Sequence, residues 1–221
     1  MNLLAFDTST DQLSIAVQRG GESWTHDGPG GAQASATLIP AIHALLGQAG
    51  LEFTALEAIV FGRGPGSFTG LRTACSIAQG LAFGAGVPVL PVDTLLAVAE
   101  EARARHGCTQ VLAALDARMG EVYHAPYRWA ADSWHGEGAF GLCAPEVLRV
   151  PPGHTLAGNA QAAYGERLAA PSAVPALPTA AALLRLAPAL MHQAVPAAEA
   201  LPLYVRDKVA QTTAEREAAK Q

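Results

Sequence analysis

The segment that most constrains the fold is a glycine-rich loop between an apolar run and an alanine-rich helical pattern. The run LEAIVF occupies residues 56–61, and the loop GRGPGSFTG after it holds four glycines and one proline between Gly62 and Gly70. A strand that enters a glycine loop and opens a helix is one β-α unit, and such units build partly parallel sheets. The same arrangement turns backbone N–H groups toward one point, where a phosphate can bind. The sequence therefore predicts an α/β fold and raises the question of a phosphate site.

Known phosphate and nucleophile motifs can be compared with this loop directly. The P-loop pattern GxxxxGK[ST] needs a lysine after the glycines, and the loop has none. The GxSxG elbow fails because Pro65 and Thr69 flank Ser67 at its two glycine positions. Gly62, Gly64 and Ser67 match only a degenerate GxGxxG. The loop residues alone favour a tight strand-to-helix turn over a working nucleotide site.

The N-terminal stretch FDTST is an acidic, hydroxyl-rich turn between two predicted strands, LLAFD and LSIAVQ. In several phosphotransfer folds such a hairpin binds phosphate oxygens, while an acid orients magnesium-bound water. Taken by itself, the stretch fits an Asx or ST turn in which Asp7 and Thr8 cap the local backbone. Combined with the glycine loop about fifty residues later, it predicts a vestigial nucleotide loop. The candidate residues are Asp7, Thr8, Ser9, Gly64, Gly66 and Ser67.

Strands and helices alternate after the glycine loop. Helical patterns cover about residues 71–84 and 94–107, and the apolar run VPVLPV separates them. The segment QVLAALDARMGEVYHAPYRW then predicts two adjacent strands joined by a tight turn. Arg118 lies between Asp116 and Glu121 in this turn, which favours a structural salt bridge over a catalytic acid pair. The alternation indicates a partly parallel sheet.

Two helical patterns carry apolar residues on more than one side. In ATLIPAIHALL, residues 36–46, Ile39 and His43 lie beside the main leucine and isoleucine stripe. In TACSIAQGLAFG, residues 73–84, alanines recur at four-residue spacing, and Phe83 falls near another face. These patterns fit either a fully buried helix or a helix that packs on its own sheet and on another protein.

Composition limits the classes of function. A net charge of -5 and a pI near 5.8 argue against the chain alone holding a nucleic-acid backbone. Cys75, Cys108 and Cys143 are odd in number and far apart, which predicts reduced thiols without a disulfide or zinc. The seven histidines show no HxxxH or HxxH spacing, so we expect no metal site. The N-terminus has no signal pattern and no apolar stretch reaches about 18 residues, so we expect a cytoplasmic protein without membrane segments.

Four segments, LLAFDTST, GRGPGSFTGLR, LDARMGEVY and YVRDKVA, resemble in order and spacing the bacterial TsaB (YeaZ) family over nearly the whole chain. The resemblance implies a two-lobed α/β fold of the actin-like, sugar-kinase-like (ribonuclease H-like) class. It implies an N-terminal lobe over residues 1–100, onto which a tail of about residues 203–221 packs back, and a smaller C-terminal lobe over residues 101–202. One departure is GGAQASATLIP, where a His-Ser pair commonly precedes the helix and Gln33 and Ala34 stand near it instead.

The resemblance also implies a function. TsaB proteins are non-catalytic partners in making N6-threonylcarbamoyladenosine at position 37 of ANN-decoding tRNAs, with the metal-bearing transferase TsaD and the P-loop ATPase TsaE. TsaD carries an HxEGH-type metal motif shortly after the strand that corresponds here to VPVLPV, where this chain has Thr94 and Val98. Neither side chain binds a metal as histidine does. We therefore expect a catalytically empty subunit that needs no cofactor, with ATP and the metal held by partner subunits and tRNA contacted only through the complex.

The partner contact implied by the resemblance lies on the two helical patterns described above. They would pack against TsaD as a four-helix interface or, in the isolated chain, against a second copy as a homodimer. The residues expected at the contact are Ser35, Leu38, Ile39, Ile42, His43, Thr73, Ala74, Ile77, Ala78 and Leu81.

Two other activities stay open from the residues alone. One is an ATP-dependent phosphotransferase that uses the FDTST turn and the glycine loop, and the other is a glycoprotease-like peptidase. The missing lysine and the lack of a second well-placed acid argue against the first. The lack of metal ligands argues against the second.

Overall fold

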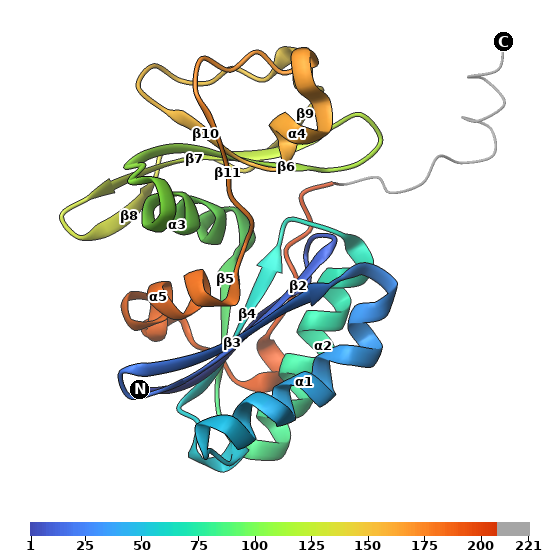
Figure 1. Cartoon of the computed structure of the whole chain (residues 1–221), viewed down its shortest axis with the longest axis vertical. Helices are drawn as coiled ribbons and strands as arrows, with labels where there is room; N and C mark the ends of the chain where they lie inside the picture. Colours follow the sequence, from blue (N-terminus) through green and yellow to red (C-terminus); the bar gives the residue numbers. More distant parts are fainter. Residues whose placement is uncertain (207–221) are drawn as a thin grey trace, which may run out of the picture.

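Two α/β lobes, one above the other, make up the chain (Figure 1), and the computed structural model describes residues 1–206. The sheet order is β3-β2-β1-β4-β5 in the first lobe and β11-β10-β6-β7-β8 in the second, where β9 also pairs with β7. The strands are β1 (Asn2–Asp7), β2 (Gln12–Arg19), β3 (Glu22–Pro29), β4 (Ala58–Gly64), β5 (Val89–Asp93), β6 (Gln110–Asp116), β7 (Val122–Ala130), β8 (Ser133–Gly136), β9 (Gly141–Cys143), β10 (Thr155–Gly158) and β11 (Ala173–Pro175). The α-helices are α1 (Ala34–Ala49), α2 (Phe68–Ala85), α3 (Thr94–His106), α4 (Ala160–Tyr164) and α5 (Ala180–Leu190).

The central strands of the first sheet are buried on both faces, whereas the edge strand β3 is mostly exposed. Strands β1, β2 and β3 form an antiparallel meander, and β4 and β5 run parallel to β1. Successive side chains of a strand point to opposite faces. Leu4 and Phe6 therefore pack in the core beneath α1 and α2, whereas Leu3 and Ala5 pack in the core beneath α5. Burial from both sides explains why β1 and β4 are almost continuously apolar.

The second sheet is covered in the same way. Helix α3 lies between this sheet and the first lobe, and α4 lies on the far face (Figure 1). Val111 and Leu115 of β6 pack in the core of α3, whereas Leu112 and Ala114 of the same strand pack in the core of α4. Within residues 1–206, no helix has both the length and the apolar composition needed to span a bilayer.

The predicted two-lobed α/β class and most predicted elements are confirmed. The β1–β2 hairpin, the β-α-β-α alternation and the tight turn between β6 and β7 all form. Helix α2 begins earlier than expected, at Phe68, because the Ser67 hydroxyl caps it by accepting a hydrogen bond from the Gly70 N–H. Helix α1 continues through Pro40 and ends at Gly50, which adopts the left-handed conformation.

The chain changes lobes at other positions than the predicted boundaries of 1–100 and 101–202. Helix α3, from Thr94 on, already packs on the second sheet. Helix α5 returns to the first lobe, because Leu183 and Leu186 on its apolar face cover Leu3 and Val60 of that sheet. The reason for the difference is tertiary: an amphipathic helix does not reveal in its sequence which of two sheets it covers.

The expected return of the C-terminal tail is seen only at its start. The N–H of Leu203 donates to the carbonyl oxygen of Arg63 at 2.7 Å, which places this point of the chain on β4. Residues 207–221 lie outside the described part of the chain.

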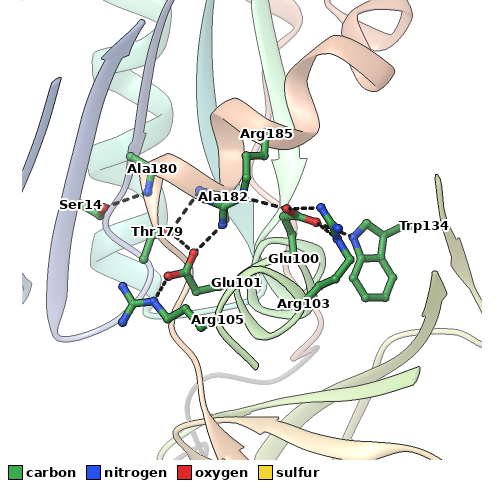
Figure 2. A network of polar contacts seen from close by, with 10 residues as sticks. All are labelled: Ser14, Glu100, Glu101, Arg103, Arg105, Trp134, Thr179, Ala180, Ala182 and Arg185. Carbon is green, nitrogen blue, oxygen red and sulfur yellow. Dashed lines mark hydrogen bonds and ion pairs between the residues drawn. The ribbon is translucent and has the colours of Figure 1, made fainter. Parts of the chain in front are cut away.

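Polar contacts connect the two lobes where α3 meets α5 (Figure 2). Glu100 of α3 accepts hydrogen bonds from Arg103, from Trp134 of β8 and from Arg185 of α5. Burial opposes the charge of this carboxylate, yet the three donors hold the pKa of Glu100 below its usual range. The carboxylate is therefore charged at neutral pH within the lobe junction.

Candidate functional site

The FDTST turn closes on itself. Asp7 Oδ1 accepts hydrogen bonds from the Ser9 N–H at 2.8 Å and from the Ser9 hydroxyl at 2.6 Å, which forms the Asx turn considered above. The Thr8 hydroxyl donates to the carbonyl oxygen of Gly70 at 2.7 Å. The side chains of Asp7 and Thr8 thus form hydrogen bonds to backbone groups of the protein, and Asp7, Thr8 and Ser9 are buried.

The glycines of the loop make room for this turn. A Cβ atom on Gly62 would lie 1.8 Å from Asp7 Oδ2, and one on Gly70 would lie 1.9 Å from the carbonyl oxygen of Thr8. A Cβ atom on Gly66 would lie 2.6 Å from the Cβ of Ser9. No larger residue fits at these three positions without moving the turn. The close approach of two backbone segments explains a glycine pattern that resembles a phosphate loop.

Two N–H groups of the loop also have internal acceptors. Ser67 N–H donates to the carbonyl oxygen of Ser9 at 2.7 Å, and Gly64 N–H donates to Thr94 Oγ1 at 3.1 Å. Gly64 has a φ of 121° and carries the backbone of Leu203 against it, so that a Cβ atom would lie 2.5 Å from the Leu203 oxygen. These two donors, which a nucleotide loop could turn toward a phosphate, are engaged in protein contacts here.

Asp7, the acid of the FDTST turn, has a raised pKa. Burial raises its pKa to about 6, and the two hydrogen bonds from Ser9 together with the nearby Thr94 hydroxyl only partly offset this effect. Its second oxygen, Oδ2, is buried and has no hydrogen-bond partner within the described residues. This oxygen faces the backbone of Gly62.

A cleft with a volume of about 350 Å³ lies between the lobes above the turn. The first lobe lines it with Ser9, Gly66 and Ser67, and the second lobe lines it with the β6–β7 turn and Asn159. Residues 203–206 form a further part of the wall. The structure therefore brings all six candidate residues of the vestigial nucleotide loop together, but only three of them line the cleft. Asp7, Thr8 and Gly64 lie beneath its floor.

The arginines that line the cleft are paired with carboxylates. Arg118 forms ion pairs with Asp116, at 3.1 Å, and with Asp11 across the cleft. Arg206 pairs with Glu121 at 2.6 Å. The predicted salt bridge between Arg118 and Asp116 is confirmed, whereas Glu121 takes a partner 85 residues away that no local pattern indicates. Residues 204–206, the described part of YVRDKVA, thus meet the segment LDARMGEVY at this cleft.

The positions that correspond to the TsaD metal ligands are part of the packed core. Thr94 and Val98 are both fully buried, and the Thr94 hydroxyl is occupied by the Gly64 N–H. Among residues 1–206, no three His, Cys, Asp or Glu side chains gather as a metal site requires. The side chains at these positions do not fit a metal. That the protein works without metal or cofactor stays a prediction.

The predicted partner contact on α1 and α2 divides into two groups. The first group is fully buried in the core of the first lobe and has no surface to offer a partner; it consists of Leu38, Ile42, Ala74 and Ala78. These four predictions are corrected, because the sequence stripe that they form faces the sheet of their own chain. The second group lies at the surface and consists of Ser35, Ile39 and His43, which are exposed, and Thr73, Ile77 and Leu81, which are partly buried.

A further apolar residue, absent from the predicted contact, extends this surface. Phe83 is 85% exposed near the end of α2, and Ile39 of α1 is 41% exposed. The helical pattern places Phe83 away from the buried alanine row, and this was the signal for its exposure. We use the name α1–α2 face for the surface formed by Ile39, His43, Ile77, Leu81 and Phe83.

Comparison with known proteins gives consistent matches. The family model of TsaD, tRNA N6-adenosine threonylcarbamoyltransferase, matches residues 30–147. The chain is 41% identical over 149 residues to the tRNA threonylcarbamoyladenosine biosynthesis protein TsaB of Escherichia coli; this alignment spans 67% of the chain and just under two thirds, 64%, of that relative. It is 36% identical to TsaB of Haemophilus influenzae over 225 residues, which covers 95% of each protein.

Solved structures agree with these matches. YeaZ from Pseudomonas aeruginosa superposes with a TM-score of 0.86 at 37% sequence identity, covering 92% of this chain and 99% of that one. The expected actin-like (ribonuclease H-like) class with two lobes is confirmed. With two sheets, the glycine loop and the closed turn all in place, and with similarity along nearly its whole length, the chain belongs to the TsaB (YeaZ) family.

Proposed function

We propose that this chain is a non-catalytic scaffold subunit for the synthesis of N6-threonylcarbamoyladenosine at position 37 of ANN-decoding tRNAs. Its relatives in Escherichia coli and Haemophilus influenzae carry the name tRNA threonylcarbamoyladenosine biosynthesis protein TsaB. In this proposal it works in the cytoplasm and pairs with the transferase TsaD, while TsaE supplies the ATPase. ATP and the metal belong to those partners, and tRNA is contacted only through the complex.

The observation that carries the proposal is the α1–α2 face. Large apolar side chains are exposed on both helices, Ile39 on α1 and Phe83 on α2, and exposed apolar surface of this kind marks protein contacts. Ile39 and Phe83 are the exposed large apolar residues of this face, and Ile77 and Leu81 are partly buried against the core. We propose that TsaD binds here, and that a second copy of the chain binds here when TsaD is absent.

The state of the cleft supports a role without catalysis. The N–H groups of Gly64 and Ser67 have protein partners, as do Arg118 and Arg206, so a phosphate that used these groups would have to displace those partners. Thr94 and Val98 leave no ligand for a metal at the positions that correspond to TsaD. The net charge of -5 supports indirect contact with tRNA.

Reconstitution tests the proposal. Formation of the modified nucleoside is measured with TsaD, TsaE, threonylcarbamoyl adenylate, ATP and tRNA, with and without this chain. We expect product only when the chain is present, and we expect Ile39→Arg and Phe83→Asp to lose both activity and complex formation in light scattering. The matched control is Val147→Arg, because Val147 is 58% exposed in the second lobe and far from α1 and α2 in the sequence.

Two results would contradict the proposal. One is equal modification in the absence of the chain, which would remove its role in the reaction. The other is product formation by the chain without TsaD, which would make it an enzyme. A third result would contradict only the proposed contact. If product formation needs the chain but Ile39→Arg and Phe83→Asp behave like the control, the scaffold role stands and TsaD binds elsewhere.

A further inference from the structure

A buried polar network crosses the lobe junction between α3 and α5 (Figure 2). Arg185 of α5 donates from Nε to Glu100 at 2.8 Å and from Nη2 to Glu101 at 2.7 Å, so one guanidinium binds two carboxylates of α3. The two glutamate side chains are only 2% and 5% exposed. Removing Arg185 would weaken the compensation of two buried charges at once, although each carboxylate keeps other donors. We call these contacts the α3–α5 lock.

The lock extends into both sheets. Trp134 of β8 donates from Nε1 to Glu100 at 2.9 Å, and the hydroxyl of Thr179 donates to the other carboxylate at 2.8 Å. At the start of α5, the Ala180 N–H donates to the hydroxyl of Ser14 on β2 at 2.8 Å. Polar contacts therefore run from β2 in the first sheet, through α5 and α3, to β8 in the second sheet (Figure 2).

A second set of contacts joins the lobes at the cleft. Residues 203–206, which we call the strap, pass there from the first lobe to the second. Leu203 N–H donates to the carbonyl oxygen of Arg63 in β4 at 2.7 Å, and Arg206 Nη2 donates to Glu121 at 2.6 Å. The same guanidinium nitrogen also donates to the carbonyl oxygen of Ala117 at 3.1 Å. The strap is thereby fixed to both lobes while it lines the cleft.

The two sets of contacts lie on different sides of the junction, since the strap leaves the first lobe on the side away from α3 and α5 (Figure 1). A rotation that opens the cleft has to stretch the strap, because the strap lines the cleft and is bonded to both lobes. Closure of two domains around a ligand needs a junction that rearranges at little cost in free energy. A guanidinium that joins two carboxylates only 2% and 5% exposed does not meet that condition, because its release would leave both buried charges with fewer partners.

We propose that the α3–α5 lock and the strap hold the two lobes at one angle, so that the chain is a single rigid body whose cleft does not open and close around a ligand. Surfaces on the two lobes are then offered to any partner in one fixed relative orientation. This inference does not depend on the proposed function, because it concerns the isolated chain.

Distances between spin labels test the proposal. One label is placed at Gln48→Cys on α1 and the other at Ala162→Cys on α4, both exposed positions. Cys108 and Cys143 are replaced by serine, while Cys75 is buried and stays. We expect one narrow distance distribution by double electron–electron resonance, and we expect it to stay unchanged when magnesium and ATP are added.

Variants identify the contacts responsible. Arg185→Met and Arg206→Met each remove a guanidinium that joins the lobes, and together they are expected to broaden the distribution about twofold or more. The matched control is Arg167→Met, which breaks an ion pair with Glu146 within the second lobe and should leave the width unchanged. Circular dichroism checks that each variant folds. If Arg185→Met does not fold, Arg206→Met alone still tests the strap.

Several outcomes would overturn the proposal. A broad or two-peaked distribution in the unmodified chain would show that the lobes already move. A shift of the distance on addition of magnesium and ATP would show ligand-driven closure. Folded variants that remain as narrow as Arg167→Met would show that neither contact sets the angle.

Discussion

The buried carboxylate of Asp7 makes a quantitative prediction about folding stability. Its pKa lies at about 6 in the folded protein, above the ordinary value of 3.8, and burial is the main cause. A raised pKa means that the folded state binds the proton more tightly than the unfolded chain does. The stability that comes from this proton is complete below about pH 4 and is lost as the pH rises to about 6.

Replacing the carboxylate with an amide of the same shape removes this loss. At about 1.4 kcal/mol per pH unit, the difference between 3.8 and about 6 corresponds to about 3 kcal/mol. In Asp7→Asn, the amide oxygen keeps the two hydrogen bonds from Ser9, and the amide nitrogen replaces the unpartnered oxygen beside Gly62. We therefore expect the variant and the original chain to have similar stability near pH 4, and the variant to gain about 3 kcal/mol over it by pH 8.

Urea unfolding at pH values from 4 to 8 measures this difference. The control, Asp27→Asn, makes the same chemical change at an exposed position of β3. Unfolding free energies of the original chain and Asp7→Asn that run parallel across this range would refute the reasoning, because the carboxylate would then have the same proton affinity in both states. A direct NMR titration of the Asp7 carboxyl carbon, with a midpoint near 4, would refute it independently.

Three further predictions follow from the same contacts. Gly70→Ala should destabilise the fold by about 2–4 kcal/mol, because the new Cβ would lie 1.9 Å from the carbonyl oxygen of Thr8. The control is Gly80→Ala in the same helix, which has open space around it and should be neutral or stabilise by up to about 1 kcal/mol. Thermal unfolding measures both variants. Glu100→Gln should lower the free energy of unfolding by about 3 kcal/mol at pH 7. This loss should shrink as the pH falls below the ordinary carboxyl range, because the pKa of Glu100 is lowered and its charge stops contributing once it is protonated. Unfolding free energies of the variant and the original chain that stay parallel in acid would contradict this. ATP with magnesium at millimolar concentration should not raise the melting temperature, and micromolar binding that is abolished by Asp7→Ala would favour a phosphotransferase instead.

Local patterns predicted most elements from β1 to β7, because their information lies within a few residues. The apolar run before Gly62 and the helical pattern after Gly70 fix β4 and α2 whatever surrounds them. What local patterns could not supply was the direction in which a helix faces. Ala74 and Ala78 belong to an alanine row that suits a close contact with another protein and equally a close contact with the helix's own sheet, and the structure has the latter.

Long-range pairs were not predictable for a different reason. Arg206 and Glu121 are separated by 85 residues, and neither carries a local sign of the other. The two carboxylates of α3 look like a solvated charge pair in the sequence AEEARAR, yet both are buried because Arg185 approaches from another lobe. Buried charges of this kind become visible only when the packing of distant elements is known.

The glycine loop shows how the same sequence pattern can serve a ligand or the chain itself. A phosphate loop needs glycines so that a backbone can approach the phosphate and expose its N–H groups. Here glycines allow the backbone to approach the Asp7 turn and the strap, and Ser67 N–H donates to a protein carbonyl. A phosphate at this place would have to replace short buried hydrogen bonds and leave their former partners unsatisfied, at a cost of about 1–3 kcal/mol for each group. The loop thus retains the shape of a ligand site while its binding groups stabilise the junction between turn, strand and strap.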